Sequence, residues 1–184
     1  MFAIQAETLQ GHLSSITASK TVTLPSARPP AEFSLDNFDG EASRLNWTGS
    51  GPAVQVARAT DVSLEGDACL EVTYRKTAEA DRGAFLTAAL DVRDITRYNY
   101  LSLWVAGKAT LTVRLVDTHG NYQDTESAAS VKLDAWTPLF FDLAKLAPLD
   151  RSSIERIMIL VEPDQTNVEG IIFIDSINLT LARN

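Results

Sequence analysis

The chain has 184 residues, of which 45% are hydrophobic and 22% are charged, and its formal net charge at pH 7 is −8. This length suits one domain with or without an arm, and it is enough to bury a core without disulfides. The acidic balance argues against nucleic acid and anionic membrane surfaces as partners, and no apolar run reaches the length of a membrane span. Neutral sugars and basic protein surfaces remain compatible with this charge.

Residues 1–32 differ from the rest of the chain. They are rich in Ser, Thr, Ala and Pro, their hydrophobic periodicity is weak, and Pro29 and Pro30 close the segment like a linker. We interpret residues 1–32 as an N-terminal arm or linker that packs either on the domain or on a partner, and residues 33–184 as a β-sandwich binding domain. No signal-peptide pattern is visible, so we expect a cytoplasmic protein or a mature or excised piece of a secreted one.

From Phe33 onward the sequence has the pattern of β-strands. Leu111, Val113 and Leu115 alternate with residues suited to an outer face, as in a strand with one buried side. The further strands that we expect cover residues 70–75, 84–90, 100–106, 131–133, 137–142, 156–162 and 171–181. Short strands between polar turns, without a long amphipathic helix, predict an all-β fold, a jelly-roll β-sandwich of two antiparallel sheets with roughly eight to ten strands.

Seven stretches of the sequence occur in a recognisable order: "LDNFDG" with "NW", "GDACLEVTYR", "DVRDITRYNYLSLWVAG", "TLTVRLVDTHGN", "LDAWTPLFFDLAKL", "IERIMILVEP" and "GIIFIDSINL". Taken in this order, they resemble the galactose-binding-like β-sandwich family. The resemblance is to the group that contains the family 11 carbohydrate-binding modules and the complex I intermediate-associated protein 30 (CIA30-like) domains. The resemblance covers about residues 33–181 and implies a galactose-binding-domain-like sandwich, but it does not specify a ligand.

Outward polar residues of these strands predict a ligand face. Sugar recognition needs guanidinium and carboxylate groups that hydrogen-bond hydroxyls, beside a ring on which the sugar can stack. Tyr122 follows the turn "DTHGN" and is either such a platform or a turn anchor. The residues that we expect to bind ligand on the concave sheet face are Arg75, Arg114, Asp117, Tyr122 and Glu162. An ordinary solvated sheet face with cross-strand pairs is the alternative for each of them.

The resemblance also implies one structural calcium ion. Asp39 in "NFDG", Asp67 in "EGDA" and Asp175 in "FIDS" stand at positions like those of the family's oxygen ligands, and calcium is bound by sets of such oxygens. Ser176 departs from the family, which usually has a second aspartate there. The alternative is that these aspartates cap turns through their own backbone.

No catalytic constellation is visible in the sequence. It contains no nucleophile elbow, no zinc-binding His-Glu-x-x-His, no phosphate-binding glycine loop and no dinucleotide fingerprint. We expect Cys69 to be a small buried hydrophobe and Trp47, Trp104 and Trp136 to have packing roles. The sequence therefore favours a binding protein over an enzyme.

Two functions follow from these observations. The first is a non-catalytic carbohydrate-binding module that recognises a polysaccharide or oligosaccharide on the concave sheet face. The alternative is a protein-interaction or assembly subunit of a larger complex, which uses the same sandwich and the N-terminal arm. Neither includes nucleic acid or membrane insertion, and neither fixes the location of the protein.

Overall fold

A computed structural model describes residues 32–40, 43–50, 53–75, 84–126, 135–162 and 169–181 of the chain. The arm predicted over residues 1–32 therefore lies outside the described residues except for Glu32, and so does the strand predicted over residues 131–133. The described strands are β1 (Glu32–Asp36), β2 (Thr48–Gly49), β3 (Val54–Ala59), β4 (Cys69–Arg75), β5 (Ala84–Ala89), β6 (Tyr100–Gly107), β7 (Thr110–Asp117), β8 (Tyr122–Glu126), β9 (Thr137–Asp142), β10 (Ile154–Glu162) and β11 (Glu169–Thr180). A short 3-10 helix, η2 (Leu143–Leu146), follows β9.

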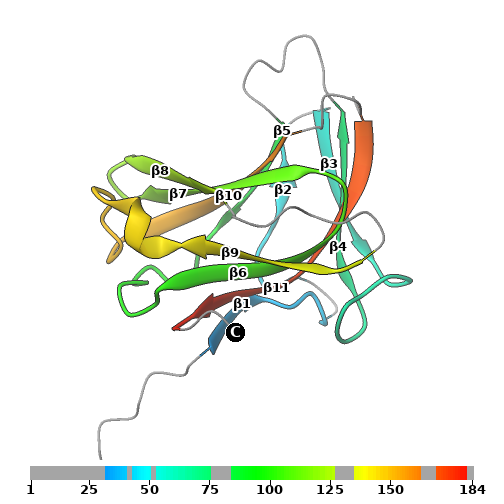
Figure 1. Cartoon of the computed structure of the whole chain (residues 1–184), viewed down its shortest axis with the longest axis horizontal. Helices are drawn as coiled ribbons and strands as arrows, with labels where there is room; N and C mark the ends of the chain where they lie inside the picture. Colours follow the sequence, from blue (N-terminus) through cyan, green and yellow to red (C-terminus); the bar gives the residue numbers. More distant parts are fainter. Residues whose placement is uncertain are drawn as a thin grey trace, which may run out of the picture.

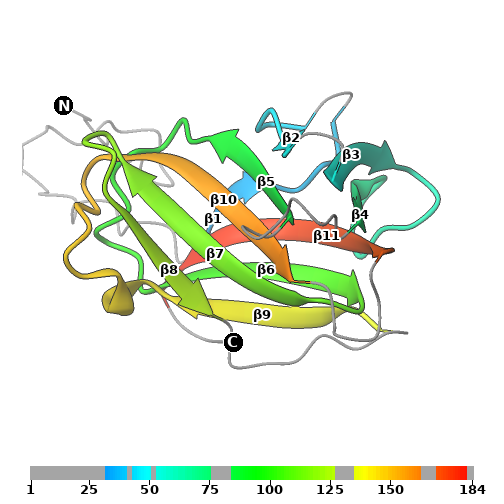
Figure 2. The same ribbon diagram turned by 90° about the horizontal axis from the view of Figure 1, so that it is seen from above.

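The strands form two sheets that pack face to face (Figures 1 and 2). The six-stranded sheet has the order β3-β4-β11-β6-β9, with β1 also paired to β11, and the five-stranded sheet has the order β2-β5-β10-β7-β8. Every pairing is antiparallel. The predicted all-β sandwich of two antiparallel sheets is confirmed. No helix in the described ranges is long and apolar enough to cross a membrane.

The core lies between the two sheets and is built from alternate residues of each strand. In β7, Leu111, Val113 and Leu115 are buried, as their period-two spacing predicts. Val105 of β6 and Ile172 of β11 contribute to the same core from the opposite sheet. This burial supplies the main stabilisation of the fold, because apolar area removed from water contributes roughly 25 cal/mol per Å².

The long strand β11 joins the two halves of the six-stranded sheet. Its first half pairs with β4 and its second half with β1, while β6 runs along its other edge. The register against β6 shifts between Asp175 and Asn178, and Ser176 has a φ of 49° at this bulge. Such a bulge bends the strand, which lets one strand hold two partners in succession on the same edge.

One buried carboxylate organises the segment after β1. Asp36 is 1% exposed and accepts hydrogen bonds from the backbone N–H of Leu45 at 3.0 Å and from the Trp47 indole N–H at 3.1 Å. It also accepts bonds from Phe38 N at 3.1 Å and from the Ser43 hydroxyl. A buried carboxylate is stable only when its oxygens are satisfied in this way, so Asp36 fixes the conformation of the segment that carries Trp47 into the core.

Candidate functional site

A continuous row of paired residues crosses the outer face of the five-stranded sheet. It runs through Thr48 (β2), Thr87 (β5), Met158 (β10), Arg114 (β7) and Asp124 (β8). Their chain neighbours in the longer strands, such as Leu86, Ile157 and Leu115, are buried between the sheets. Because successive side chains of a strand point to opposite sides, the row faces away from the core. Figure 2 shows this sheet as the nearer layer.

Three side chains at the β7–β8 edge form the best-organised part of this face. Arg114 Nε donates to Asp124 Oδ1 at 2.6 Å, and Arg114 Nη2 donates to Asp124 Oδ2 at 2.8 Å. The guanidinium carbon also lies 4.3 Å from the centroid of the Tyr122 ring. The hydrogen bonds to Asp124 raise the pKa of Arg114 above its ordinary value. Arg114 is thus held on one side by two hydrogen bonds to a carboxylate and on the other side by the face of an aromatic ring.

Tyr122 remains open to solvent despite this contact. It is 60% exposed, while Arg114 and Asp124 have side-chain exposures of 26% and 39%. Beside Tyr122, the outer face of the five-stranded sheet also carries half-buried apolar side chains. Two of them are Val116 of β7, which is paired with Tyr122, and Leu160 of β10. An exposed ring next to fixed polar groups on a partly apolar floor is the composition of a small-ligand site.

The structure separates the other residues predicted to bind ligand. Arg75 ends β4 in the six-stranded sheet, where Arg75 Nε donates to Glu169 Oε2 at 3.0 Å, so it does not share a face with Arg114. Glu162 belongs to the five-stranded sheet, but it pairs with Thr110 at the end of β7 away from Tyr122. The expectation that Arg75 and Arg114 share one ligand face is wrong, because alternation assigns a residue to an outer side without saying which sheet it belongs to.

Asp117 is buried and organises the turn before β8. Its carboxylate accepts hydrogen bonds from the backbone N–H groups of His119 and Asn121, both at 2.9 Å, and from the Asn121 side chain. The bond from the Asn121 side chain is the main reason why the pKa of Asp117 is lowered. With no exposed area left for a sugar hydroxyl, Asp117 acts on the site by shaping the turn that presents Tyr122.

The three predicted calcium ligands lie around the segment that precedes β4. Asp175 is buried, and its Oδ2 accepts from Leu64 N at 2.9 Å and from Glu65 N at 3.3 Å. Burial is the main reason why its pKa is raised. Asp39 Oδ1 accepts from Asp67 N at 2.9 Å. Within the described residues no three His, Cys, Asp or Glu side chains gather so as to hold a metal, and the structural calcium stays a prediction.

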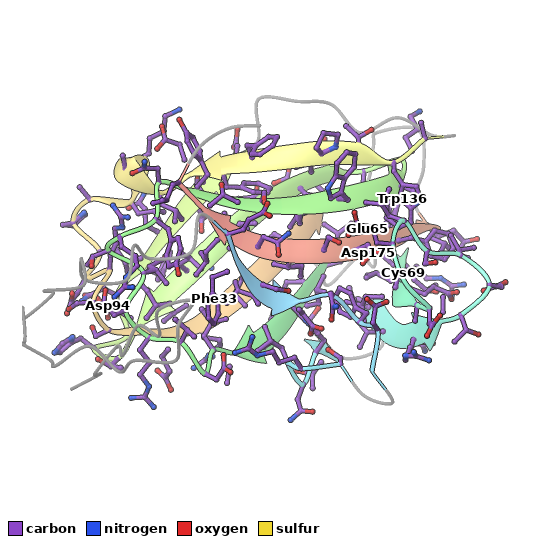
Figure 3. All side chains as sticks on the ribbon, turned by 90° about the horizontal axis from the view of Figure 1, so that it is seen from below. Phe33, Glu65, Cys69, Asp94, Trp136 and Asp175 are labelled. Atoms are coloured by element: carbon purple, nitrogen blue, oxygen red, sulfur yellow. The ribbon has the colours of Figure 1, made fainter. Side chains whose placement is uncertain are left out.

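Cys69 lies close to this region but offers no reactive thiolate. Its Sγ–H donates to the carbonyl of Val62 at 2.9 Å, and burial raises the pKa of the thiol to about 12. Figure 3, which views the six-stranded sheet from outside, places Cys69, Glu65 and Asp175 at the same end of that sheet. The expectation of a small buried side chain is confirmed, because Cys69 has 0% exposure.

Sequence reasoning missed Asp124 and assigned the tryptophans only in part. Strand β8 reads "YQDTE", which has no apolar alternation, yet Tyr122, Asp124 and Glu126 share its outer side. Trp47 is buried as expected, whereas Trp104 and Trp136 are only half-buried. Trp104 pairs with Asp175 and Pro138 on the outer side of the six-stranded sheet.

No protein-family model matches the chain, and no curated protein matches it either. Solved structures do match its fold. The family 11 carbohydrate-binding module of Clostridium thermocellum, solved with a β-1,3-1,4-mixed-linked tetrasaccharide, is 21% identical, with a TM-score of 0.56, and the match covers 82% of this chain and 96% of that one.

Two family 22 modules are similar to the same extent. The CBM22-1 xylan-binding domain of Paenibacillus barcinonensis Xyn10C is 17% identical, with a TM-score of 0.57, over 85% of this chain and 100% of that one. The C-terminal family 22 module of Clostridium thermocellum Xyn10B is 17% identical, with a TM-score of 0.56, over 86% and 98%. The chain therefore has the β-sandwich fold of these carbohydrate-binding modules.

Proposed function

We propose that this protein is a non-catalytic carbohydrate-binding module that holds a glycan chain on the outer face of its five-stranded sheet. The observation that carries the proposal is the Tyr122 ring, which is 60% exposed while Arg114 lies over it and is itself bonded to Asp124. The C–H face of a pyranose packs on such a ring, and the ring is already held in place before the sugar arrives. Preorganisation of this kind lowers the entropic cost of binding.

Arg114 supplies the directional part of the interaction. A guanidinium has five N–H donors, and the bonds to Asp124 use one on Nε and one on Nη2. The donors that remain can bind sugar hydroxyls, and the carboxylate of Asp124 can accept from a hydroxyl through its free lone pairs. Neighbouring apolar groups such as Met158 and Leu160 would lie beneath the less polar parts of the sugar.

The similar solved structures support a glycan as the ligand class. One of them was solved with a β-1,3-1,4-mixed-linked tetrasaccharide and another is a xylan-binding domain. Both ligands are neutral chains of pyranose units, which agrees with a face where Arg114 is neutralised by Asp124. They define the first probes to use, mixed-linked β-glucan and xylan oligosaccharides.

Calorimetric titration with a panel of glycans tests the proposal. The panel holds mixed-linked β-glucan, xylan, cellulose and starch oligosaccharides together with bacterial surface glycans. We expect one class to bind, Tyr122→Ala to weaken that binding by about tenfold or more, and Arg75→Ala, on the other sheet, to leave it unchanged. A wild-type protein that binds no glycan of the panel, or a Tyr122→Ala variant that binds as well as wild type, would overturn the proposal.

A second function rests on a different surface. Ile171 of β11 is 50% exposed on the outer side of the six-stranded sheet, and half-buried Phe173, Trp104 and Pro138 continue that side along the chain and across the strands. Contiguous apolar surface of this kind marks protein contacts in many proteins. We infer that, if the protein is an assembly subunit, this side and residues 1–32 contact the partner.

The test is the size of the complex isolated from native cells, which Ile171→Glu and removal of residues 1–32 should both reduce. A size that neither change affects would exclude this function.

A further inference from the structure

Arg156 lies on the same outer face as Tyr122, two strands further into the sheet. In the register of β10 with its neighbours, Arg156 pairs with Val116 of β7 and with Ala89 of β5, and Val116 pairs in turn with Tyr122 of β8. Tyr122, Val116 and Arg156 are therefore successive members of one row. Two strand spacings separate Tyr122 from Arg156, roughly 10 Å between backbones.

Arg156 differs from Arg114 in its charge balance. Arg114 is paired with Asp124, whereas Arg156 is exposed and takes part in none of the ion pairs that link described residues. Glu155 precedes it at the register shift of β10, but the two side chains form no ion pair. On the row that ends at Tyr122, Arg156 is thus a positive charge without a protein counter-ion in the described part of the chain.

Apart from Glu155 beside Arg156 and Asp124, which is paired with Arg114, the described carboxylates of this face lie at its opposite end. Glu162 is six residues further along β10, roughly 20 Å away in an extended strand. Glu126 pairs with Thr112, whose partner in β10 is Leu160, four residues from Arg156 and so roughly 13 Å along the strand. Both separations exceed the screening length of about 8 Å in physiological salt. Among the described residues, the face therefore has an arginine without an ion pair, Arg156, at the end that carries Tyr122, and two carboxylates without ion pairs, Glu126 and Glu162, at the other end.

We infer that Arg156 binds a carboxylate carried by the glycan, so that the preferred ligand is a largely neutral chain bearing uronic acid units. The inference rests on the proposed function. A sugar packed on Tyr122 lies over Val116, and the long side chain of Arg156 can meet it from the other side of that residue. A guanidinium matches a carboxylate with two parallel hydrogen bonds, a geometry that a point charge does not offer.

The net charge of the protein limits how many uronic acid units a bound glycan can carry. With a net charge of −8, the protein repels a polyuronate as a whole. A neutral chain with sparse acidic branches escapes that repulsion and still places one carboxylate at Arg156. The selected class is therefore a sparsely acidic glycan, in contrast to both a neutral chain and a polyanion.

The experiment compares three related oligosaccharides, of which the two branched ones differ only at one group. They are xylohexaose, the same chain with a single glucuronic acid branch, and that branched chain after chemical reduction of its carboxylate to the alcohol. At low salt we expect the acidic form to bind roughly three- to tenfold more tightly than the reduced form, as for a partly exposed charged hydrogen bond. In 0.5 M NaCl the difference should shrink.

Two variants and a control assign the preference to Arg156. Arg156→Gln should remove it and leave affinity for the neutral chain unchanged, and Arg156→Lys should restore part of it. Arg97→Gln, which changes an exposed arginine of the 91–99 segment, should leave it intact. Equal binding of acidic and reduced forms, or a preference that survives Arg156→Gln, overturns the inference while the proposed function stands. Equal preference for a sulfated branch overturns the carboxylate assignment, and failure of every glycan in the panel overturns both proposals.

Discussion

The guanidinium of Arg114 lies over the ring of Tyr122, with its central carbon 4.3 Å from the ring centroid. This contact covers one side of the ring, and Tyr122 still remains 60% exposed. It also links the ring to Asp124, which accepts two hydrogen bonds from the same guanidinium. Ring, cation and carboxylate therefore behave as one unit, and changes to each should have different consequences.

Replacing the ring should weaken glycan binding without unfolding the protein. Tyr122→Ala should lower glycan affinity by about tenfold or more, because a stacked ring supplies much of the buried contact. Tyr122→Phe should keep most of the affinity, because the proposed contact is made by the ring and not by the hydroxyl. Titration calorimetry gives the affinities and thermal unfolding checks the fold. Equal affinities for the Ala variant and wild type would contradict the role of the ring.

Replacing the carboxylate should loosen the arginine. The amide of Asp124→Asn has only one acceptor oxygen, so Arg114 loses one of its two hydrogen bonds and becomes mobile. We therefore expect glycan affinity to fall by roughly three- to tenfold. Global stability should change by less than about 1 kcal/mol, because the pair is partly exposed. Glu126→Gln, two residues further along the same side of β8, is the matched control. A Glu126→Gln variant that loses as much affinity as Asp124→Asn would show that glycan affinity depends on the negative charge of the face and not on the paired hydrogen bonds between Arg114 and Asp124.

The buried carboxylate of Asp36 should be essential for stability. Asp36→Ala leaves the N–H groups of Leu45 and Trp47 without their acceptor, so we expect the free energy of unfolding to fall by about 3–5 kcal/mol. Asp91→Ala breaks an exposed ion pair with Arg44 and should cost less than about 1 kcal/mol. Urea titrations of both variants measure these values. A loss for Asp36→Ala as small as that for Asp91→Ala would refute the role assigned to Asp36.

Asp150 should make stability depend on acid pH. Hydrogen bonds from the Ser152 hydroxyl, the Ser153 hydroxyl and Ser152 N lower its pKa to about 2. A carboxylate whose pKa is lower in the folded than in the unfolded state stabilises the fold above the unfolded value of about 4, and this contribution is lost as the pH falls through the folded pKa. The stability difference between wild type and Asp150→Asn should therefore shrink between pH 4 and pH 2 in urea titrations. A difference that is constant over this range would contradict the assignment.

Much of the sheet structure could be predicted from local pattern. β7 and β9 follow directly from alternation, since their buried apolar residues recur at every second position. β3 reads "VQVARA", whose apolar residues do not keep a period of two, and β8 reads "YQDTE", in which Tyr122 alone is apolar, so neither shows the alternation that signals a strand. These two strands lie at sheet edges, where the pattern of burial is weaker.

The site could be predicted only one residue at a time. The sequence predicts Tyr122 from its polar setting and Arg114 from its outward position in an alternating strand, but their contact with each other depends on the register of β7 against β8. Arg75 has the same local pattern as Arg114 and belongs to the other sheet. The pairing of distant strands is a property of the folded chain, so no local sequence pattern could have separated these two arginines.

Chemical-shift mapping by NMR tests the central claim most directly. A 15N-labelled sample of the full chain would be titrated with the oligosaccharide that the glycan panel selects, and amide shifts would be followed residue by residue. We predict that the changes concentrate at Tyr122, Arg114, Val116 and Asp124 and extend across the outer face of the five-stranded sheet. Changes that cluster instead around Trp104, Phe173 and Ile171 on the six-stranded sheet would contradict the account.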